Sequence, residues 1–230
     1  MPLTSILSVQ VRPDRFAQYE ELVRNLAARA VEKKDAFHWT AHQTAYGELG
    51  TLHFVSEDPN FAGIAARGNV QELVHRVLGE DKGAKALASM LECTISQQVT
   101  ISLDRPELSY PTERGARIFF AAVVTQIRAR PGGQEALEEL IRKIAEAIPK
   151  VGDSTRMMAY QVMVGMLAEY WTARPLEDLS ELDSQLPPAE LLDRAFGAAE
   201  GGLIYRTGLE AIEEVKRQIV VYREDLSNPG

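Results

Sequence analysis

The chain of 230 residues has a single cysteine, Cys93, and its longest strongly apolar run covers only residues 118–124. A lone cysteine excludes an intrachain disulfide, so a reducing, cytoplasmic location is the simple expectation. A membrane helix needs about 20 apolar residues, and none is predicted. The N-terminus also lacks the basic segment and apolar core that are typical of a signal peptide.

Positive charge is scarce as well. The chain carries 25 Lys and Arg against 33 Asp and Glu, and the basic residues are scattered rather than clustered. Because nucleic-acid binding calls for a basic surface patch, no nucleic acid is expected as a partner. Neither a glycine-rich phosphate loop nor a nucleophile-elbow motif is present. The composition, 45% apolar and 25% charged, is typical of a globular protein.

An internal repeat is the strongest feature that the sequence does contain. At an offset of 118 residues, and without any gap, Arg12 matches Arg130, Gln43 matches Gln161, and Arg105 matches Arg223. A match of this kind along nearly the whole chain indicates that one unit of roughly 110 residues was duplicated and fused. We therefore predict a first repeat at 1–105, a linker at 106–117 and a second repeat at 118–230.

Each repeat predicts the same order of elements. In the first repeat, apolar periodicity and turn residues predict a strand, a helix, a two-stranded hairpin, a helix and a last strand at residues 5–11, 15–32, 37–46, 51–56, 70–78 and 95–103. This β-α-β-β-α-β order is that of the ferredoxin-like unit, whose sheet carries helices on one face only. We expect an α+β fold in which two such repeats pack sheet to sheet as an intramolecular α/β barrel, a pseudo-dimer within one chain.

The sequence resembles the dimeric α/β-barrel superfamily, and most closely its antibiotic-biosynthesis-monooxygenase-like and NIPSNAP-like branches. The motifs that carry the resemblance lie on strands and at the ends of the two repeats: Leu52-His53-Phe54, Glu169-Tyr170-Trp171-Thr172, 105–109 and 223–227. The resemblance implies a small-molecule enzyme, such as a cofactor-free monooxygenase, acting on an apolar aromatic or polyketide-like compound. The alternative is a non-catalytic ligand-binding or interaction protein of the same fold.

Histidine is confined to the first repeat, at His38, His42, His53 and His75. With a hairpin turn at 47–50, Thr44 is expected opposite His53, with His42 diagonal to it on the same face. A histidine base beside a dry pocket would deprotonate a phenol or an enol. We predict catalytic and substrate-contacting roles for six residues: His53, His42, Trp39, Tyr46, Tyr160 and Trp171. The other interpretation is that these polar side chains are satisfied at a sheet surface.

Bound metals and cofactors are not expected. His38 and His42 lie about 13 Å apart along one strand, too far to chelate a single ion. Haem-degrading members of the superfamily use a helix histidine, for which His75 is the candidate, but residues 5–11 lack the accompanying asparagine. The expected partners are a small apolar ligand and a second copy of the chain in a further homodimer. A cavity beside His42 and His53 would favour the enzyme over the non-catalytic binder.

Overall fold

The computed structural model describes residues 2–111 and 119–230, so residues 112–117 of the predicted linker lie outside the described residues. The chain divides into two compact units: unit 1 combines Met1–Ser102 with Val221–Gly230, and unit 2 is Leu103–Val220. The predicted repeat boundaries stay a prediction. In the described part of the chain, every helix is too short or too polar to cross a membrane.

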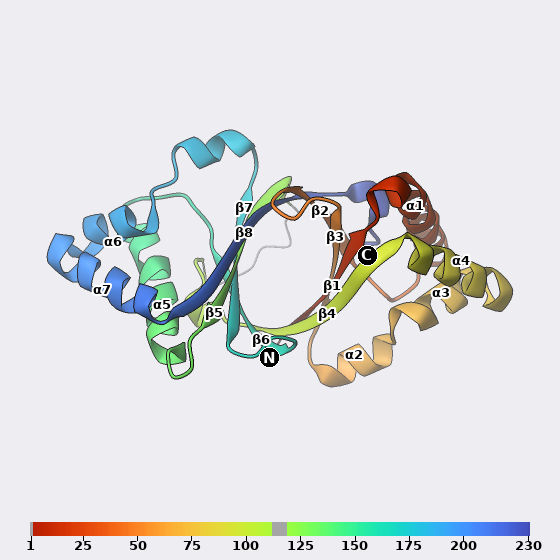
Figure 1. The fold of residues 1–230 in the computed structure, drawn as a ribbon, viewed down its shortest axis with the longest axis horizontal. Helices are drawn as coiled ribbons and strands as arrows, with labels where there is room; N and C mark the ends of the chain where they lie inside the picture. The colour runs from red at the N-terminus through yellow and green to blue at the C-terminus, as the bar shows by residue number, and fades with distance from the viewer. Residues whose placement is uncertain (1, 112–118) are drawn as a thin grey trace. The chain divides into compact units, whose positions relative to one another are not determined.

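Among the described residues, unit 1 contains four α-helices and four strands, of which the last extends two residues into unit 2. Its elements are β1 (Leu3–Val11), α1 (Phe16–Lys33), β2 (Thr40–Tyr46), β3 (Thr51–Asp58), α2 (Phe61–Arg67), α3 (Val70–Leu78), α4 (Glu80–Cys93) and β4 (Thr94–Asp104). Helices α1, α3 and α4 pack on one another and lie on one side of the strands (Figure 1). The core of the unit therefore forms between this helical layer and one face of the sheet.

Unit 2 repeats this order with one difference. Its elements are β5 (Ala121–Ala129), α5 (Gln134–Lys150), β6 (Met158–Val164), β7 (Glu169–Leu176), α6 (Pro188–Phe196), α7 (Ala198–Glu210) and β8 (Ile212–Tyr222). A short 3-10 helix at Leu179–Asp183 occupies the place of α2. Helices α5, α6 and α7 again gather on one side of their strands (Figure 1).

Hydrogen bonds link the strands of the described residues in the order β1-β3-β2-β8-β5-β7-β6-β4, which closes a barrel. In unit 1, β3 pairs antiparallel with both β1 and β2, and in unit 2, β7 does the same with β5 and β6. The predicted α+β class and the barrel are thus confirmed.

Helix α1 shows why these sequences form these elements. Tyr19, Val23, Leu26 and Ala30 recur at helical spacing and are all buried, so one apolar stripe packs on the sheet. The helix ends at Lys34, whose left-handed conformation (φ 51°) lets its N–H bond to the carbonyl oxygens of the last turn. Helix and sheet together exclude water from the core, which is the main source of stability in such a layer.

Unit 2 includes the residues that follow β4, and unit 1 includes those that follow β8. In unit 2, Arg105 donates from both terminal nitrogens to the Glu138 carboxylate at 2.9 Å, and it also donates to the side-chain oxygen of Gln161. In unit 1, Arg223 donates from Nη1 alone to both Glu20 and Gln43, and its other two nitrogens donate to Asp225. We call these two arrangements the arginine clamps. All three positions differ by 118, so the matched residues of the two repeats make matched contacts.

The register of the β2–β3 hairpin differs from the prediction. His42, not Thr44, lies directly opposite His53, and Gln43 lies opposite Leu52. The predicted register assumed that the strands pair up to the four residues 47–50. Instead the ladder between the two strands ends at Gln43, although β2 itself continues to Tyr46. His42 and His53 still share one face, because directly paired residues of a sheet point to the same side.

Candidate functional site

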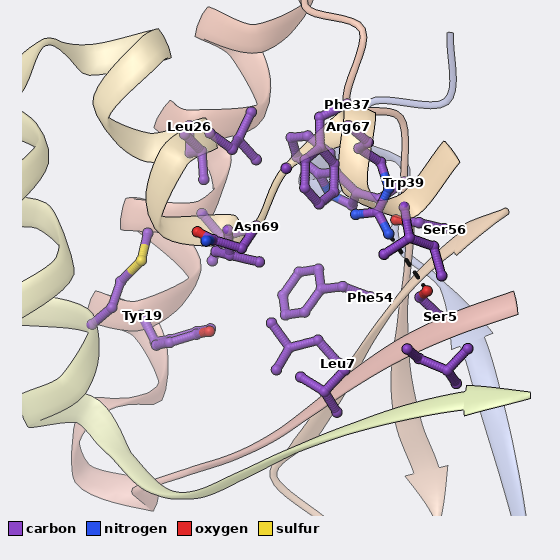
Figure 2. Close-up of a pocket in the computed structure, with 18 residues that line it drawn as sticks. Ser5, Leu7, Tyr19, Leu26, Phe37, Trp39, Phe54, Ser56, Arg67 and Asn69 are labelled. Carbon is purple, nitrogen blue, oxygen red and sulfur yellow. Dashed lines mark hydrogen bonds between the residues drawn. The ribbon is translucent and has the colours of Figure 1, made fainter. Parts of the chain in front are cut away.

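Unit 1 contains a cavity of about 200 Å³ between the helix-covered face of its sheet and the helices (Figure 2). Its walls are mainly apolar and aromatic, and they come from the strands β1, β3 and β4, the helices α1 to α4 and the segment before β2. Typical wall residues are Leu7, Tyr19, Leu26, Phe37, Trp39 and Phe54. Such a lining favours an apolar ligand with an aromatic body.

The alternation of β1 and β3 forms the floor of this cavity. Ser5 lies opposite Ser56, and Leu7 lies opposite Phe54, in the antiparallel ladder. Because side chains alternate across a strand, these four residues share the face that the helices cover. The residues between them, among them Ser8 and His53, face the other side of the sheet. The alternation along β1 and β3 therefore places the cavity and the histidines on opposite faces of the sheet.

Arg67 forms a polar end to the cavity. Its Nε and Nη2 atoms donate to the carboxylate of Asp58 at 3.1 and 2.9 Å, and Nη2 also donates to Ser5 Oγ at 3.4 Å. The centre of the guanidinium lies 4.2 Å from the ring centroid of Phe37. Figure 2 shows Arg67, Ser5 and Ser56 together at one side of the cavity, with Tyr19 at the other. A ligand held here would meet hydrogen-bond donors at one end and apolar walls elsewhere.

Two aromatic side chains are held in place by their surroundings. The indole Nε1 of Trp39 donates to the Leu226 carbonyl oxygen at 2.8 Å, which fixes the ring while its body lines the cavity. Phe37 meets Trp39 edge to face at a centroid distance of 6.1 Å. Burial raises the pKa of Tyr19, so its phenol stays protonated and can donate a hydrogen bond.

The two predicted catalytic histidines lie on the other face of the sheet and do not line the cavity. His53 Nδ1 lies 2.9 Å from Ser8 Oγ, and its Nε2 lies 3.1 Å from Thr44 Oγ1, so both ring nitrogens are bound to hydroxyl groups. His42 Nε2 lies 3.0 Å from Thr40 Oγ1. The structure brings the two histidines together but separates them from the cavity.

Burial lowers the pKa of His53 to about 4. Burial, and next the neighbouring His53, lower the pKa of His42 to about 4 as well. Both rings are therefore neutral at neutral pH, the form that a general base needs. A neutral ring is not evidence that a substrate lies beside it, so the catalytic role of the two histidines stays a prediction.

The remaining predicted substrate contacts are dispersed. Tyr46 is 60% exposed at the end of β2. In unit 2, Tyr160 donates a hydrogen bond to the sulfur of Met158, and the indole of buried Trp171 donates to Glu169. Of the six residues predicted for the site, Trp39 lines the cavity described here.

A haem-ligand role for His75 does not fit the structure. His75 lies on α3 outside the cavity lining, and its Nδ1 faces Glu80 Oε2 at 3.3 Å. Within the described residues, no three His, Cys, Asp or Glu side chains are grouped so as to hold a metal ion. No side chain of the cavity lining offers an imidazole, thiolate or carboxylate as a ligand.

Sequence reasoning missed Asp58, Arg67 and Phe37. One signal was available: Asp58 and Arg67 match Leu176 and Gln185, so the first repeat carries an opposite-charge pair where the second carries none. Nothing in the sequence, however, shows that the intervening chain returns the guanidinium to the carboxylate.

Comparison with known proteins identifies the fold. No family model matches the chain, and no curated protein matches it. An anthrone oxidase-like protein aligns with a TM-score of 0.60 at 15% identity, covering 100% of this chain and 94% of that one. A candidate monooxygenase from Lactobacillus acidophilus NCFM aligns with a TM-score of 0.59 at 8% identity, covering 96% and 93%.

A third solved structure is similar over the same length. The chlorite dismutase of Candidatus Nitrospira defluvii, in complex with imidazole, aligns with a TM-score of 0.54 at 12% identity, covering 98% of this chain and 93% of that one. These structures share the fold of this chain over nearly its whole length. At such low identity they establish the fold alone, because one fold supports many activities.

Proposed function

We propose that unit 1 binds a small, flat, apolar aromatic molecule in its cavity, and that the chain acts on this molecule as a monooxygenase-like enzyme. The observation that carries the proposal is the aromatic cavity with one polar end at Arg67. The names of the structural neighbours, a candidate monooxygenase and an anthrone oxidase-like protein, support the reaction class. In the same proposal, the chain consists of two ferredoxin-like repeats, which the common order of elements supports.

The size of the cavity narrows the ligand. Ligand sites of drug-sized molecules usually measure about 300–1,000 Å³, whereas this cavity measures about 200 Å³. An engineered apolar cavity of about 150 Å³ in another protein accepts benzene. A ligand with one or two fused rings therefore fits better than a three-ring, polyketide-like compound.

The chemistry would need no bound cofactor if the substrate itself reduces oxygen. A ring CH₂ group that is activated as its enol reacts with O₂ to give a ring C=O and one molecule of water, so the substrate supplies all the electrons. The protein would exclude water, and Arg67 would stabilise the oxygen anion of the enolate. This step needs a base, and the cavity lining contains no imidazole, carboxylate or thiolate.

That shortage of bases favours a second candidate function, non-catalytic binding of the same ligand class. The two candidates differ in oxygen uptake. We expect an electrode to record oxygen consumption when the wild-type protein meets a one- or two-ring hydroxylated aromatic. Binding without oxygen consumption by the wild-type protein would establish the non-catalytic function. Absence of binding would overturn both.

A further inference from the structure

Unit 2 contains an arginine in an unusual place. Arg174 lies on β7 opposite Val123 of β5. It shares its sheet face with Tyr170 and Thr172, which are 1% and 8% exposed, so it lies on the face that the helices cover. Arginines in such positions are normally paired, because an uncompensated charge is costly to remove from water.

Arg174 has no such pairing. Arg67, Arg105 and Arg223 each bind a carboxylate, but Arg174 has no ion pair or hydrogen bond among the residues that the structure describes. Burial is the largest cause of the lowered pKa of Arg174, and the positive charge of Arg217 is the second. The carboxylate of Asp153 opposes this shift, but its Oδ1 already accepts bonds from the backbone N–H and the hydroxyl of Thr155.

The positions of both arginines match cavity-lining positions of unit 1. Arg174 and Arg217 match Ser56 and Val99, which line the cavity there. Where the cavity of unit 1 has a serine and a valine at these two positions, unit 2 has two guanidinium groups.

We propose that Arg174 and Arg217 form a binding site in unit 2 for a small oxyanion, a phosphate or carboxylate group. The anion supplies the charge that the protein does not, and guanidinium groups bind such oxygens through two parallel N–H donors. The site is independent of the cavity in unit 1 and of any reaction there.

Thermal unfolding at constant ionic strength tests this site, with inorganic phosphate replacing chloride as the probe. We expect saturating phosphate to raise the Tm of the wild-type protein by about 3 °C. Arg174→Gln should abolish this shift and should be at least as stable as the wild type in chloride, because it removes an unpaired, half-buried charge. Arg29→Gln, which removes a charge from an exposed pair with Glu32 on α1, should keep the full shift.

Two results would overturn the proposal. One is an equal phosphate shift in the wild type and in Arg174→Gln, which would reflect a general salt effect. The other is a marked loss of stability for Arg174→Gln in chloride, which would mean that the guanidinium is already paired. If Arg174→Gln does not fold, the exposed Arg217→Gln decides: it should raise the half-saturating phosphate concentration at least about fivefold, and an unchanged value would refute the site.

Discussion

The two units share a scaffold but differ in the side chains that the scaffold displays. Matched positions that hold the structure together are the same: both arginine clamps are complete, and Leu73 and Leu191 are both buried. Matched positions along the cavity have diverged, from Phe54 to Thr172 and from Ser56 to Arg174. The comparison teaches that the two units share the contacts between their elements, while the side chains between helices and sheet differ.

The largest expected effect comes from shortening the matched core leucines. Leu73→Ala and Leu191→Ala should each lower the free energy of unfolding by about 3 kcal/mol, measured in urea, because each removes buried methyl groups. Leu73 lines the cavity, so only its variant should also bind larger ring systems. An equal gain of binding in Leu191→Ala would contradict the assignment of the ligand site to unit 1.

The arginine clamps should have the next largest effect. Arg105→Ala should cost about 2–3 kcal/mol in the same measurement, because Glu138 and Gln161 lose a largely buried partner. Arg223→Ala should cost slightly less, since the Arg223 side chain is 20% exposed against 13% for Arg105. The control is Arg24→Ala, whose ion pairs are exposed and should contribute less than about 1 kcal/mol. Equal losses in all three variants would refute a special role for the clamps.

Acid should lower the free energy of unfolding, because His42 and His53 are buried as neutral rings. The folded-state pKa values of His42 and His53 are about 4, below the ordinary value of 6.5. Folding therefore favours the neutral rings, so their stabilisation is complete above pH 6.5 and is lost as the pH falls through 4. We expect each ring to account for a loss of about 3 kcal/mol across this window.

The variant His53→Gln should flatten this pH dependence, because the group that binds the proton is removed. Trp171 and Tyr160 occupy the matching positions in unit 2 and do not titrate in this range. Trp171→Phe is therefore the matched control and should retain the full slope. An unchanged slope in His53→Gln would show that the two rings are not kept neutral by folding.

The smallest effect on stability should come from filling the cavity. Val23 is 4% exposed and lines the cavity from α1. Val23→Phe should change the free energy of unfolding by no more than about 1 kcal/mol, because the added ring enters existing space. A loss of about 3 kcal/mol, the upper end for overpacking, would show that the space cannot accept a ring.

Much of the fold could be predicted from the sequence, because the periodicities of strands and helices are local signals. The alternation along β3 even separates Phe54 from His53 correctly. The register of the hairpin could not be predicted, because residues 44–46 are as suited to a strand as those that do pair. The partners of Gln43 and Gln161 were equally hidden, because each arginine comes from the far end of the other repeat.

The site was predicted less well, for a physical reason. Histidine is conspicuous in a sequence because it titrates near neutral pH, whereas a cavity depends on which side chains fail to fill a space. Trp39 was identified through its size, but Arg67 and Asp58 take part through a contact that only the folded chain creates. Neither the composition nor the spacing of residues in the sequence indicates such a contact.

The most direct test of the account is isothermal titration of the wild-type protein and Val23→Phe with 2-naphthol, a two-ring hydroxylated aromatic. We predict a single binding site in the wild type and a loss of affinity of at least about tenfold in Val23→Phe, because the new ring occupies the ligand's place. Equal affinity in the two proteins, or no binding to either, would contradict a ligand site in the cavity of unit 1.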